Sequence, residues 1–290
     1  MKIGLRQPPL VREMGFEAFC AWVKEAGFDH VDLGRADAEQ AKILADNGLE
    51  VGSVDLPNPK NALLNEDESA LAEALEVWRR ELPAAAEIGA KAMFTVLLPP
   101  DQAQPRSKSA DIAARTLPQL AERLEANGLS LAIEGWPGGG PQYPALGCTP
   151  ETLRRIFADT PSAAIGICFD PSHLVRLGVC YKRFLAEFGC RVRHAHGKDT
   201  VFNREERYLC GNLDSSFGGM YVCGDRAWRY TIPGEGIVDW QYVADRLADA
   251  KYEGRISVEL EDHHFWQTPE LQQEGLRRSL ALLKKVAGRV

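Results

Sequence analysis

Four stretches in the second half of the chain decide its fold: SLAIEGW at 130–136, IGICFDPSH at 165–173, VRHAHGKD at 192–199 and ISVELED at 256–262. Each begins with a short, mostly apolar run, which is typical of a buried strand. Each run leads to one side chain of a metal-ligand type, and these are Glu134, Asp170, His196 and Glu259. A charged group at the end of an apolar strand costs free energy unless it is paired or bound to a cation. Four such groups at equivalent positions therefore indicate a common site.

Similar apolar runs lie earlier in the chain, and amphipathic segments of helical periodicity separate them. We expect eight strands, at 2–5, 30–33, 51–56, 93–98, 130–136, 164–170, 192–196 and 256–260. We expect eight helices, at 16–26, 38–47, 67–88, 110–127, 149–158, 181–188, 240–250 and 270–286. Pro83 is expected to kink or split the third helix, because proline cannot donate the backbone hydrogen bond that a helix interior needs.

This alternation predicts parallel strands, and eight such units in 290 residues favour a single (β/α)8 TIM barrel, an α/β fold. An open, doubly wound sheet is the alternative, but no GxGxxG motif follows the first strand. One domain is expected over 1–290, with a long, irregular loop at about 200–232 on the C-terminal rim. A loop of this length is usually functional. It could instead form the contact of a homo-oligomer.

Composition and charge disfavour several classes of protein. The net charge is −7 and no block of basic residues stands out, which argues against a nucleic-acid-binding protein. No apolar run reaches the roughly 18 residues of a membrane span. The first residues lack the pattern of a signal peptide, so a cytoplasmic location is expected. The seven cysteines include no CxxC pair, which argues against a structural zinc site or a disulfide framework.

The chemistry of the four strand ends suggests a cation site. Side chains two residues apart in a strand share a face, so His194, His196 and Lys198 point to the same side, with Lys198 nearest the rim. Three carboxylates and one imidazole suit Mn²⁺, Mg²⁺ or Co²⁺ better than a thiolate-type zinc site. The alternative is a buried ion-pair network across the barrel mouth. It is less favoured because only Arg191 and Arg193 lie near these strand ends.

The same segments carry a family resemblance. AIEGW around Glu134, FDPSHLV from 169 to 175, HAHGKD from 194 to 199 and VELED around Glu259 occur in this order at barrel spacing. With them, the chain resembles the sugar phosphate isomerase/epimerase superfamily, the xylose isomerase-like TIM barrels, over nearly its whole length. This superfamily includes ketose 3-epimerases, inosose dehydratases and hydroxypyruvate isomerases.

The resemblance implies a set of site residues. Glu134, Asp170, His196 and Glu259 would bind one divalent ion, most often Mn²⁺, with Mg²⁺, Co²⁺ or Zn²⁺ as alternatives. Glu134 and Glu259 would also form the acid/base pair on opposite faces of the substrate. His173 would contact substrate oxygens, and Lys198 matches a basic residue of one branch of the family. Trp136 is a candidate for stacking on a sugar face, and core or rim packing is an equal alternative.

The expected activity is that of a metal-dependent isomerase or epimerase acting on a small carbohydrate. A glutamate would remove a proton next to a carbonyl, and the divalent ion would stabilise the enediolate that forms. The alternative is a lyase or dehydratase that eliminates water from a 3-keto sugar, a keto-glycoside or an inosose. It is favoured by the 200–232 loop and by Phe202 and Asn203, which stand about where the epimerase branch has an arginine.

Two other classes of protein are disfavoured. An apurinic-site endonuclease shares the barrel, but its extra zinc-binding histidines are absent from the ends of the third and fourth expected strands, SVDLP and TVLLPP. A non-catalytic sugar-binding barrel is the other class, and the two intact glutamates argue against it.

Overall fold

The computed structural model describes residues 1–290 except 141, 212, 214–216, 218–223, 225 and 289–290. Eight parallel strands form a closed barrel in the order β1-β2-β3-β4-β5-β6-β7-β10. Their bounds are Lys2–Arg6 (β1), His30–Leu33 (β2), Glu50–Asp55 (β3), Ala92–Thr95 (β4), Ser130–Glu134 (β5), Ile165–Phe169 (β6), Val192–Gly197 (β7) and Arg255–Val258 (β10). The register closes where Lys2 of β1 pairs with Arg255 of β10. The expected (β/α)8 TIM barrel is therefore confirmed.

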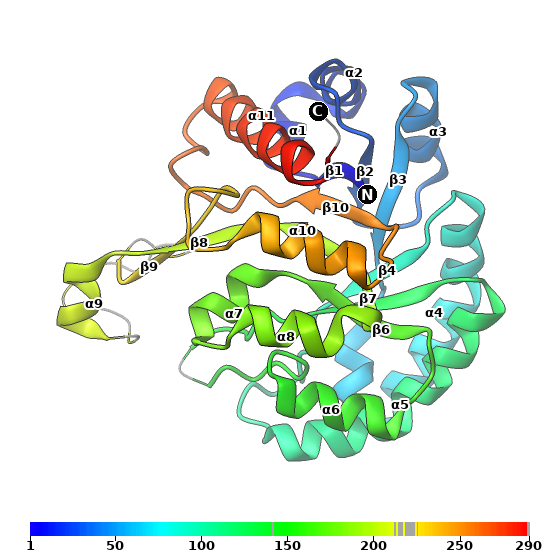
Figure 1. The fold of residues 1–290 in the computed structure, drawn as a ribbon. Coiled ribbons are helices and arrows are strands. Elements are labelled where there is room, and N and C mark those ends of the chain that lie inside the picture. Colours follow the sequence, from blue (N-terminus) through cyan, green and yellow to red (C-terminus); the bar gives the residue numbers. More distant parts are fainter. Residues whose placement is uncertain (141, 212, 214–216, 218–223, 225, 289–290) are drawn as a thin grey trace.

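Helices cover the outside of the barrel (Figure 1). The longer ones are Phe16–Ala26 (α2), Ala38–Asp46 (α3), Glu68–Glu87 (α4), Arg106–Ala126 (α5), Pro150–Asp159 (α6), Tyr181–Phe188 (α8), Trp240–Asp249 (α10) and Pro269–Val286 (α11). The shorter ones are Leu10–Met14 (α1), Pro171–Leu177 (α7) and Arg204–Cys210 (α9), with 3-10 turns at Pro59–Leu64 (η1) and Gly189–Arg191 (η2). The core lies between this helical layer and the barrel, where each strand buries apolar side chains.

One part of an expectation about the helices is wrong, because the third helix is not split at Pro83, while a kink there stays a prediction. Pro83 lies inside α4, which continues to Glu87 instead of splitting. Leu82 and Ala85, on either side of the proline, are buried against the core. This packing compensates for the backbone hydrogen bond that proline cannot make. The expected helices otherwise match α2, α3, α4, α5, α6, α8, α10 and α11 within a few residues.

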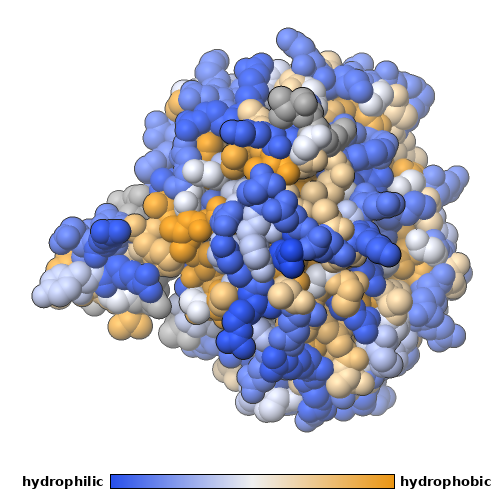
Figure 2. All heavy atoms as spheres, in the orientation of Figure 1, coloured by the Kyte–Doolittle hydropathy of each residue, from blue (hydrophilic) through white to orange (hydrophobic). Residues whose placement is uncertain are grey.

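The segment expected as an irregular loop at 200–232 is partly regular. Asp199–Phe202 (β8) pairs antiparallel with Trp228–Thr231 (β9), and α9 lies between the two strands. We call the described residues between 199 and 231 the rim arm. It projects from the C-terminal end of the barrel strands (Figure 1), and the space-filling view shows it standing out from the body of the molecule (Figure 2). The single-domain organisation over 1–290 stays a prediction.

Two further observations concern membrane-spanning helices and cysteines. None of the helices in the described part of the chain is long and apolar enough to cross a membrane. The cysteines that the structure describes are all free, namely Cys20, Cys148, Cys168, Cys180, Cys190 and Cys210. Cys223 lies outside the described residues.

Candidate metal centre and active site

The barrel brings the four predicted ligands to one end. Glu134 is the last residue of β5, His196 lies in β7, and Asp170 and Glu259 directly follow β6 and β10. One possible ligand atom from each of the four lies within 4.8 Å of the others. We call these residues the upper cluster. Because parallel strands of a barrel end on one rim, the side chains converge although they are far apart in sequence.

The imidazole of His196 is the centre of this geometry. Its Nδ1 atom lies 2.6 Å from Glu134 Oε1, 3.3 Å from Glu259 Oε2 and 3.9 Å from Asp170 Oδ2. One ring nitrogen donates at most one hydrogen, so it satisfies only one of three carboxylates that approach from different strands. Three oxygens and one nitrogen facing a common point are the donor set of a divalent cation.

The two carboxylate oxygens of Asp170 have different roles, one in capping a helix and one in the upper cluster. Oδ1 accepts hydrogen bonds from the backbone N–H and the hydroxyl of Ser172, at 2.8 and 2.6 Å, and so caps the start of α7. This fixes the carboxylate and leaves Oδ2 facing the upper cluster. Glu134, Asp170 and His196 are all buried, with exposures of 4, 3 and 0%. Three of the four side chains of the upper cluster are therefore shielded from solvent, and Glu259 is the partly open one.

Lys198 lies deeper in the site than the sequence indicated. Its side chain is 1% exposed, and Nζ donates to Glu259 and Glu261 at 2.5 and 2.8 Å and lies 3.1 Å from Asp170 Oδ2. Lys198 therefore pairs with the carboxylates in this structure. These pairs are part of a buried ion-pair network across the barrel mouth, the alternative to a cation site. The cation of this network is a lysine, whereas the sequence argument against it considered arginines.

Charge still argues for a cation at this place. The carboxylates of Glu134, Asp170, Glu259 and Glu261 surround the ammonium group of Lys198 and the imidazole of His196, so even with His196 charged the negative groups outnumber the positive ones by two. Burial opposes the charged form of Glu134, yet the His196 charge lowers its pKa well below the ordinary value. A buried excess of negative charge costs free energy unless a cation balances it. The residues present thus fit a bound divalent ion.

His173 lies beside the cluster, as expected, and Trp136 lies at its edge. His173 is 1% exposed, and its Nε2 lies 3.5 Å from Asp170 Oδ2 and 3.6 Å from Glu134 Oε2. Trp136 is half-buried, two residues beyond Glu134. Among the described residues, no ring contact joins Trp136 to the cluster, so its stacking role stays a prediction.

Sequence reasoning missed several residues of the site. Arg6, at the end of β1, lies with Nε 3.3 Å from Glu259 Oε1 and binds both oxygens of Asp55 at 2.8 and 3.0 Å. Cys168 groups with Glu134 and His196, and burial raises its thiol pKa to about 12. Its position two residues before Asp170 was the available signal, since it predicts a common strand face. Arg6 had no such signal, because a single arginine after a short strand is commonplace.

A second polar cluster lies one layer deeper in the barrel. Asp32 of β2 accepts a 2.7 Å hydrogen bond from the Ser53 N–H and lies 3.1 Å from His194 Nε2. His30 Nε2 lies 3.0 Å from the Ser257 hydroxyl. We call Asp32, His30 and His194 the inner cluster. It reaches the upper cluster through His196 Nε2, which lies 4.0 Å from Asp32 Oδ2.

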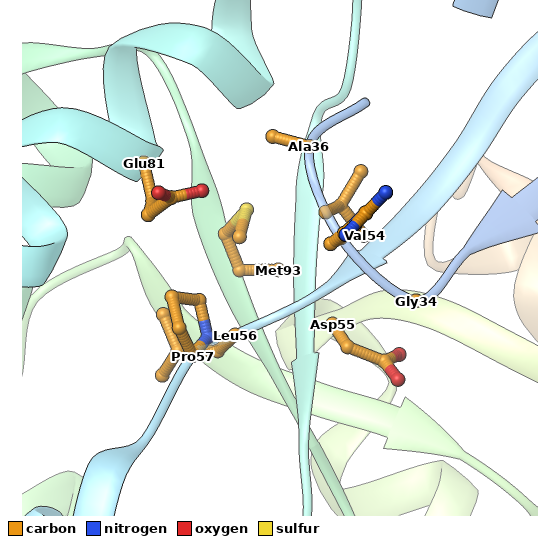
Figure 3. Close-up of a pocket in the computed structure, with 9 residues that line it drawn as sticks. Gly34, Ala36, Val54, Asp55, Leu56, Pro57, Glu81 and Met93 are labelled. Atoms are coloured by element: carbon orange, nitrogen blue, oxygen red, sulfur yellow. The ribbon is translucent and has the colours of Figure 1, made fainter. Parts of the chain in front are cut away.

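The pocket in Figure 3 is separate from the upper cluster. It lies between the ends of β2 and β3 and the helix α4, and Gly34, Ala36, Leu56, Pro57, Glu81 and Met93 are among its lining residues. Asp55 also lines it, with its carboxylate pointing away from Met93 (Figure 3). Through the Arg6 pair of Asp55, this pocket is linked to Glu259. It contains none of the predicted site residues.

Solved structures share the fold over the full chain. A xylose isomerase domain protein from Alicyclobacillus acidocaldarius aligns with a TM-score of 0.73 at 18% identity and covers 99% of both chains. D-psicose 3-epimerase, solved with D-fructose, gives a TM-score of 0.71 at 18% identity, covering 99% of this chain and 100% of its own. The IOLI protein, solved with a zinc atom, gives 0.71 at 16% identity, covering 100% and 99%.

Sequence relatives match a shorter part of the chain. Protein YfiH of Bacillus subtilis is 31% identical over 184 residues, which are 60% of this chain and 52% of that protein. An inosose dehydratase of Lactiplantibacillus plantarum is 30% identical over 154 residues, 53% of this chain and 47% of that enzyme. The chain thus spans about half the length of the curated relatives it matches.

The family model extends over nearly all of the sequence. The model of the xylose isomerase-like TIM barrel matches residues 9–286, which include every strand after β1 and the whole upper cluster. The chain therefore belongs to the xylose isomerase-like TIM barrel family.

Proposed function

We propose that this protein is a metal-dependent isomerase or epimerase acting on a sugar or keto-sugar. One observation carries the proposal: Glu134 and Glu259, from non-adjacent strands, both approach His196 Nδ1. Two carboxylates at one cation site let one remove a proton while the other returns it. The similarity to D-psicose 3-epimerase in fold supports a sugar substrate.

Glu134, Asp170, His196 and Glu259 would hold the ion, and their oxygen-rich set favours Mn²⁺, with Mg²⁺, Co²⁺ or Zn²⁺ as alternatives. The chemistry that such an ion supplies when bound is Lewis-acid polarisation of a carbonyl and its neighbouring hydroxyl. The carboxylate of Glu134 or Glu259 takes the proton from the carbon next to the carbonyl. The other carboxylic acid returns a proton, to the opposite face for epimerisation or to the adjacent carbon for isomerisation.

Three further side chains orient the substrate in this proposal. His173 and Lys198 bind its oxygens, since both line the upper cluster and are buried. Lys198 Nζ donates to Glu259 and Glu261 and lies 3.3 Å from His173 Nε2, so a substrate oxygen must replace at least one of these contacts. Trp136 is proposed to pack against an apolar sugar face.

Elimination is the second candidate. If the oxygen on the carbon beyond the deprotonated one leaves, the same site acts as a dehydratase on a 3-keto sugar, a keto-glycoside or an inosose. Lys198 paired with Glu261 places an acidic group near the site that could protonate a leaving oxygen. Burial raises the pKa of Glu261, which favours its protonated form. The similarity to inosose dehydratases supports this candidate.

A D₂O experiment separates the two candidates. Protein loaded with Mn²⁺ is incubated with a panel of ketoses, keto-glycosides and inososes, and products are read by NMR after the metal is removed. An epimerase or isomerase produces a stereoisomer or constitutional isomer that carries deuterium at the carbon that receives the proton. A dehydratase produces a compound that has lost water. When Gln variants of the site glutamates are compared in this assay, Glu253→Gln is their matched control, because Glu253 is an exposed loop residue. No turnover of any member of the panel would contradict the proposal.

We also propose that the protein forms a homo-oligomer through the rim arm. The rim arm exposes large apolar side chains, and α9 has no buried residue. These exposed side chains are Tyr208, Leu209, Leu213 and Phe217. Such residues fit the expected contact of a homo-oligomer, which the mass of the protein in solution would test.

A further inference from the structure

Arg176, near the end of α7, is a cation beside the site that has no carboxylate partner. It is half-buried, and its Nη1 atom donates to the Tyr230 hydroxyl over 3.2 Å. Its guanidinium lies over the Trp228 ring, with Cζ 4.0 Å from the ring centre. Among the described residues, the structure gives Arg176 no ion pair with an aspartate or a glutamate. The guanidinium is therefore held in place while its charge is not neutralised.

Three other cations at this end of the barrel differ from Arg176, because each pairs with a carboxylate. The pairs are Arg6 with Asp55, Lys198 with Glu259 and Arg229 with Asp262. A partly buried arginine is usually paired, since desolvation of its charge costs free energy. Of these four cations, Arg176 is the one whose charge is left for a group that comes from solution.

The aromatic rings around Arg176 leave its hydrogen-bonding edge open. Stacking on Trp228 uses the face of the guanidinium, and Tyr143, on the loop after β5, lies 5.8 Å from Cζ. The N–H groups lie along the edge of the same plane. Nη1 donates to Tyr230, and the other N–H groups have no acceptor among the described residues. An arginine held in this way matches the paired oxygens of a carboxylate or a phosphate.

One hydroxyl group joins Arg176 to the upper cluster. The Tyr230 oxygen that accepts from Arg176 lies 2.6 Å from His173 Nδ1. On the far side of the imidazole, His173 Nε2 lies 3.6 Å from Glu134 Oε2. A tyrosine hydroxyl and an imidazole thus separate the guanidinium from the predicted ligands. A sugar that binds the cluster by its carbonyl end can therefore reach Arg176 with its other end.

The rim arm fixes the two aromatic partners of Arg176 relative to the barrel. Trp228 and Tyr230 both belong to β9, and Thr231 of this strand donates from its hydroxyl to Asp262 over 2.9 Å. Thr200 of β8 donates to the Ser172 carbonyl over 2.9 Å. The arm therefore places Arg176 as well, although α7 carries it.

The charge of the upper cluster permits an anionic substrate once an ion is bound. Its negative groups outnumber the positive ones by two, and a divalent ion balances that excess. An anion near the mouth then meets the charge of Arg176 without net repulsion from the cluster.

We propose that Arg176, stacked on Trp228 and bound to the Tyr230 hydroxyl, binds an anionic group at the end of the substrate far from the reacting carbonyl. The substrate is then a sugar that carries a carboxylate or a phosphate. This inference rests on the proposed function, because the upper cluster must bind the carbonyl end. It assigns Arg176 as a specificity-determining residue of the site.

Three ligands with the same keto end test the proposal: D-fructose, D-fructuronate and D-fructose 6-phosphate. Calorimetry measures their binding to Mg²⁺-loaded protein. We expect one of the two anions to bind about 10–100-fold more tightly than D-fructose, the usual effect of charge-assisted hydrogen bonds. Which anion binds more tightly identifies the group.

Variants of Arg176 attribute the preference to its charge. Arg176→Gln keeps a donor for the Tyr230 hydroxyl but removes the charge, so it should bind the three ligands equally, whereas Arg176→Lys should keep part of the preference. Arg207→Met is the matched control, because Arg207 also stacks on a ring of the rim arm, with Cζ 4.3 Å from the Phe202 centre. It should leave the preference unchanged. Thermal unfolding checks that each variant is folded.

Three outcomes would overturn the proposal. They are equal binding of the neutral and anionic ligands by the unmodified protein, binding of none of the three, and an anion preference that survives in Arg176→Gln. The last outcome would mean that the anion binds the metal ion instead of Arg176. Binding is read without turnover, so these outcomes are distinct from failure of the proposed activity. Turnover of a neutral sugar without any anion preference would leave that activity standing and this inference overturned.

Discussion

The barrel holds two buried clusters of imidazoles and carboxylates, and they differ in balance and in access. In the inner cluster the one carboxylate has fixed partners: Asp32 binds His194 and the Ser53 N–H, and it is 1% exposed. In the upper cluster three carboxylates compete for His196 and Lys198, and the Glu259 side chain keeps 12% of its surface open. The paired carboxylate of the inner cluster stabilises the fold, although His30 Nδ1 has no hydrogen-bond partner among the described residues, whereas the over-charged and partly accessible upper cluster is poised to bind.

The pKa values of the inner-cluster side chains are consistent with this contrast. Burial would raise the pKa of Asp32, but His194 holds it well below its ordinary value, so this carboxylate stays charged beside its partner. Burial lowers the pKa of His30 to about 3, so this imidazole is neutral in the fold. The inner cluster therefore holds one charged carboxylate beside His194 and one neutral imidazole. Four predictions test the contrast, from the largest effect to the smallest.

The largest effect is expected on catalytic rate. Glu134→Gln and Glu259→Gln keep the size of the side chain but remove its basicity, and each should lower the rate by about 10²–10⁴-fold. The matched change in the inner cluster, Asp32→Asn, should lower the rate far less. Initial rates at equal metal occupancy provide the measurement. If both Gln variants turned over normally, the proton would be handled elsewhere, with His173 and Lys198 the next candidates.

Metal retention should separate the two histidines of β7. A glutamine places its amide near the Nε2 position of a histidine but has no atom at Nδ1. His196→Gln therefore loses the atom that faces the carboxylates and should weaken Mg²⁺ or Mn²⁺ binding by about 10²-fold or more, beyond the usual outer-shell effect. His194→Gln keeps a donor to Asp32 and should retain the ion. Elemental analysis and calorimetry measure both. Equal metal loss in the two variants would place the ion elsewhere.

The sequence predicted the upper cluster because its members recur at one position of four successive repeats. Glu134, Asp170, His196 and Glu259 each lie within one residue of the C-terminal end of a strand, and barrel geometry then brings them together. The boundaries differ by one residue, since β6 and β10 end just before Asp170 and Glu259. Those residues leave the strand because the chain turns there, and at Asp170 the turn begins a helix.

The remaining site residues depend on contacts between distant segments. Tyr230 and Arg176 are 54 residues apart, and Arg6 meets Asp55 over 49 residues. No local pattern encodes these pairs, because each follows from how an arm or a strand is placed in three dimensions. His194 was predicted to share the face of His196, which it does, but its partner Asp32 lies 162 residues away. The periodicity of a strand predicts which face a side chain lies on, but it does not predict which distant residue that side chain contacts.

Stability should respond to the two clusters in opposite ways. Asp32→Asn removes one partner of a buried pair and should lower the free energy of unfolding by about 3 kcal/mol. Glu134→Gln removes one charge from a site with excess negative charge, so in chelator-treated protein the stability should stay equal or rise. Urea unfolding at pH 7.5 measures both. A loss in Glu134→Gln as large as in Asp32→Asn would mean that the upper cluster is a structural ion-pair network.

The smallest effect concerns His30 and has a defined sign. The folded protein holds this imidazole neutral down to about pH 3, whereas the unfolded chain takes up a proton near pH 6.5. His30 therefore costs no stability above pH 6.5, and the free energy of unfolding falls as the pH drops from 6.5 toward 3. At pH 5, about 1.5 units below the unfolded value, this single group should account for about 2 kcal/mol. His30→Gln keeps an amide near the Ser257 hydroxyl and does not titrate. The loss of stability between pH 7.5 and pH 5 should therefore be about 2 kcal/mol smaller in His30→Gln than in the unmodified protein. An identical loss in both proteins would show that His30 is protonated in the fold, and the inner cluster would then carry a positive charge on His30 beside the carboxylate of Asp32.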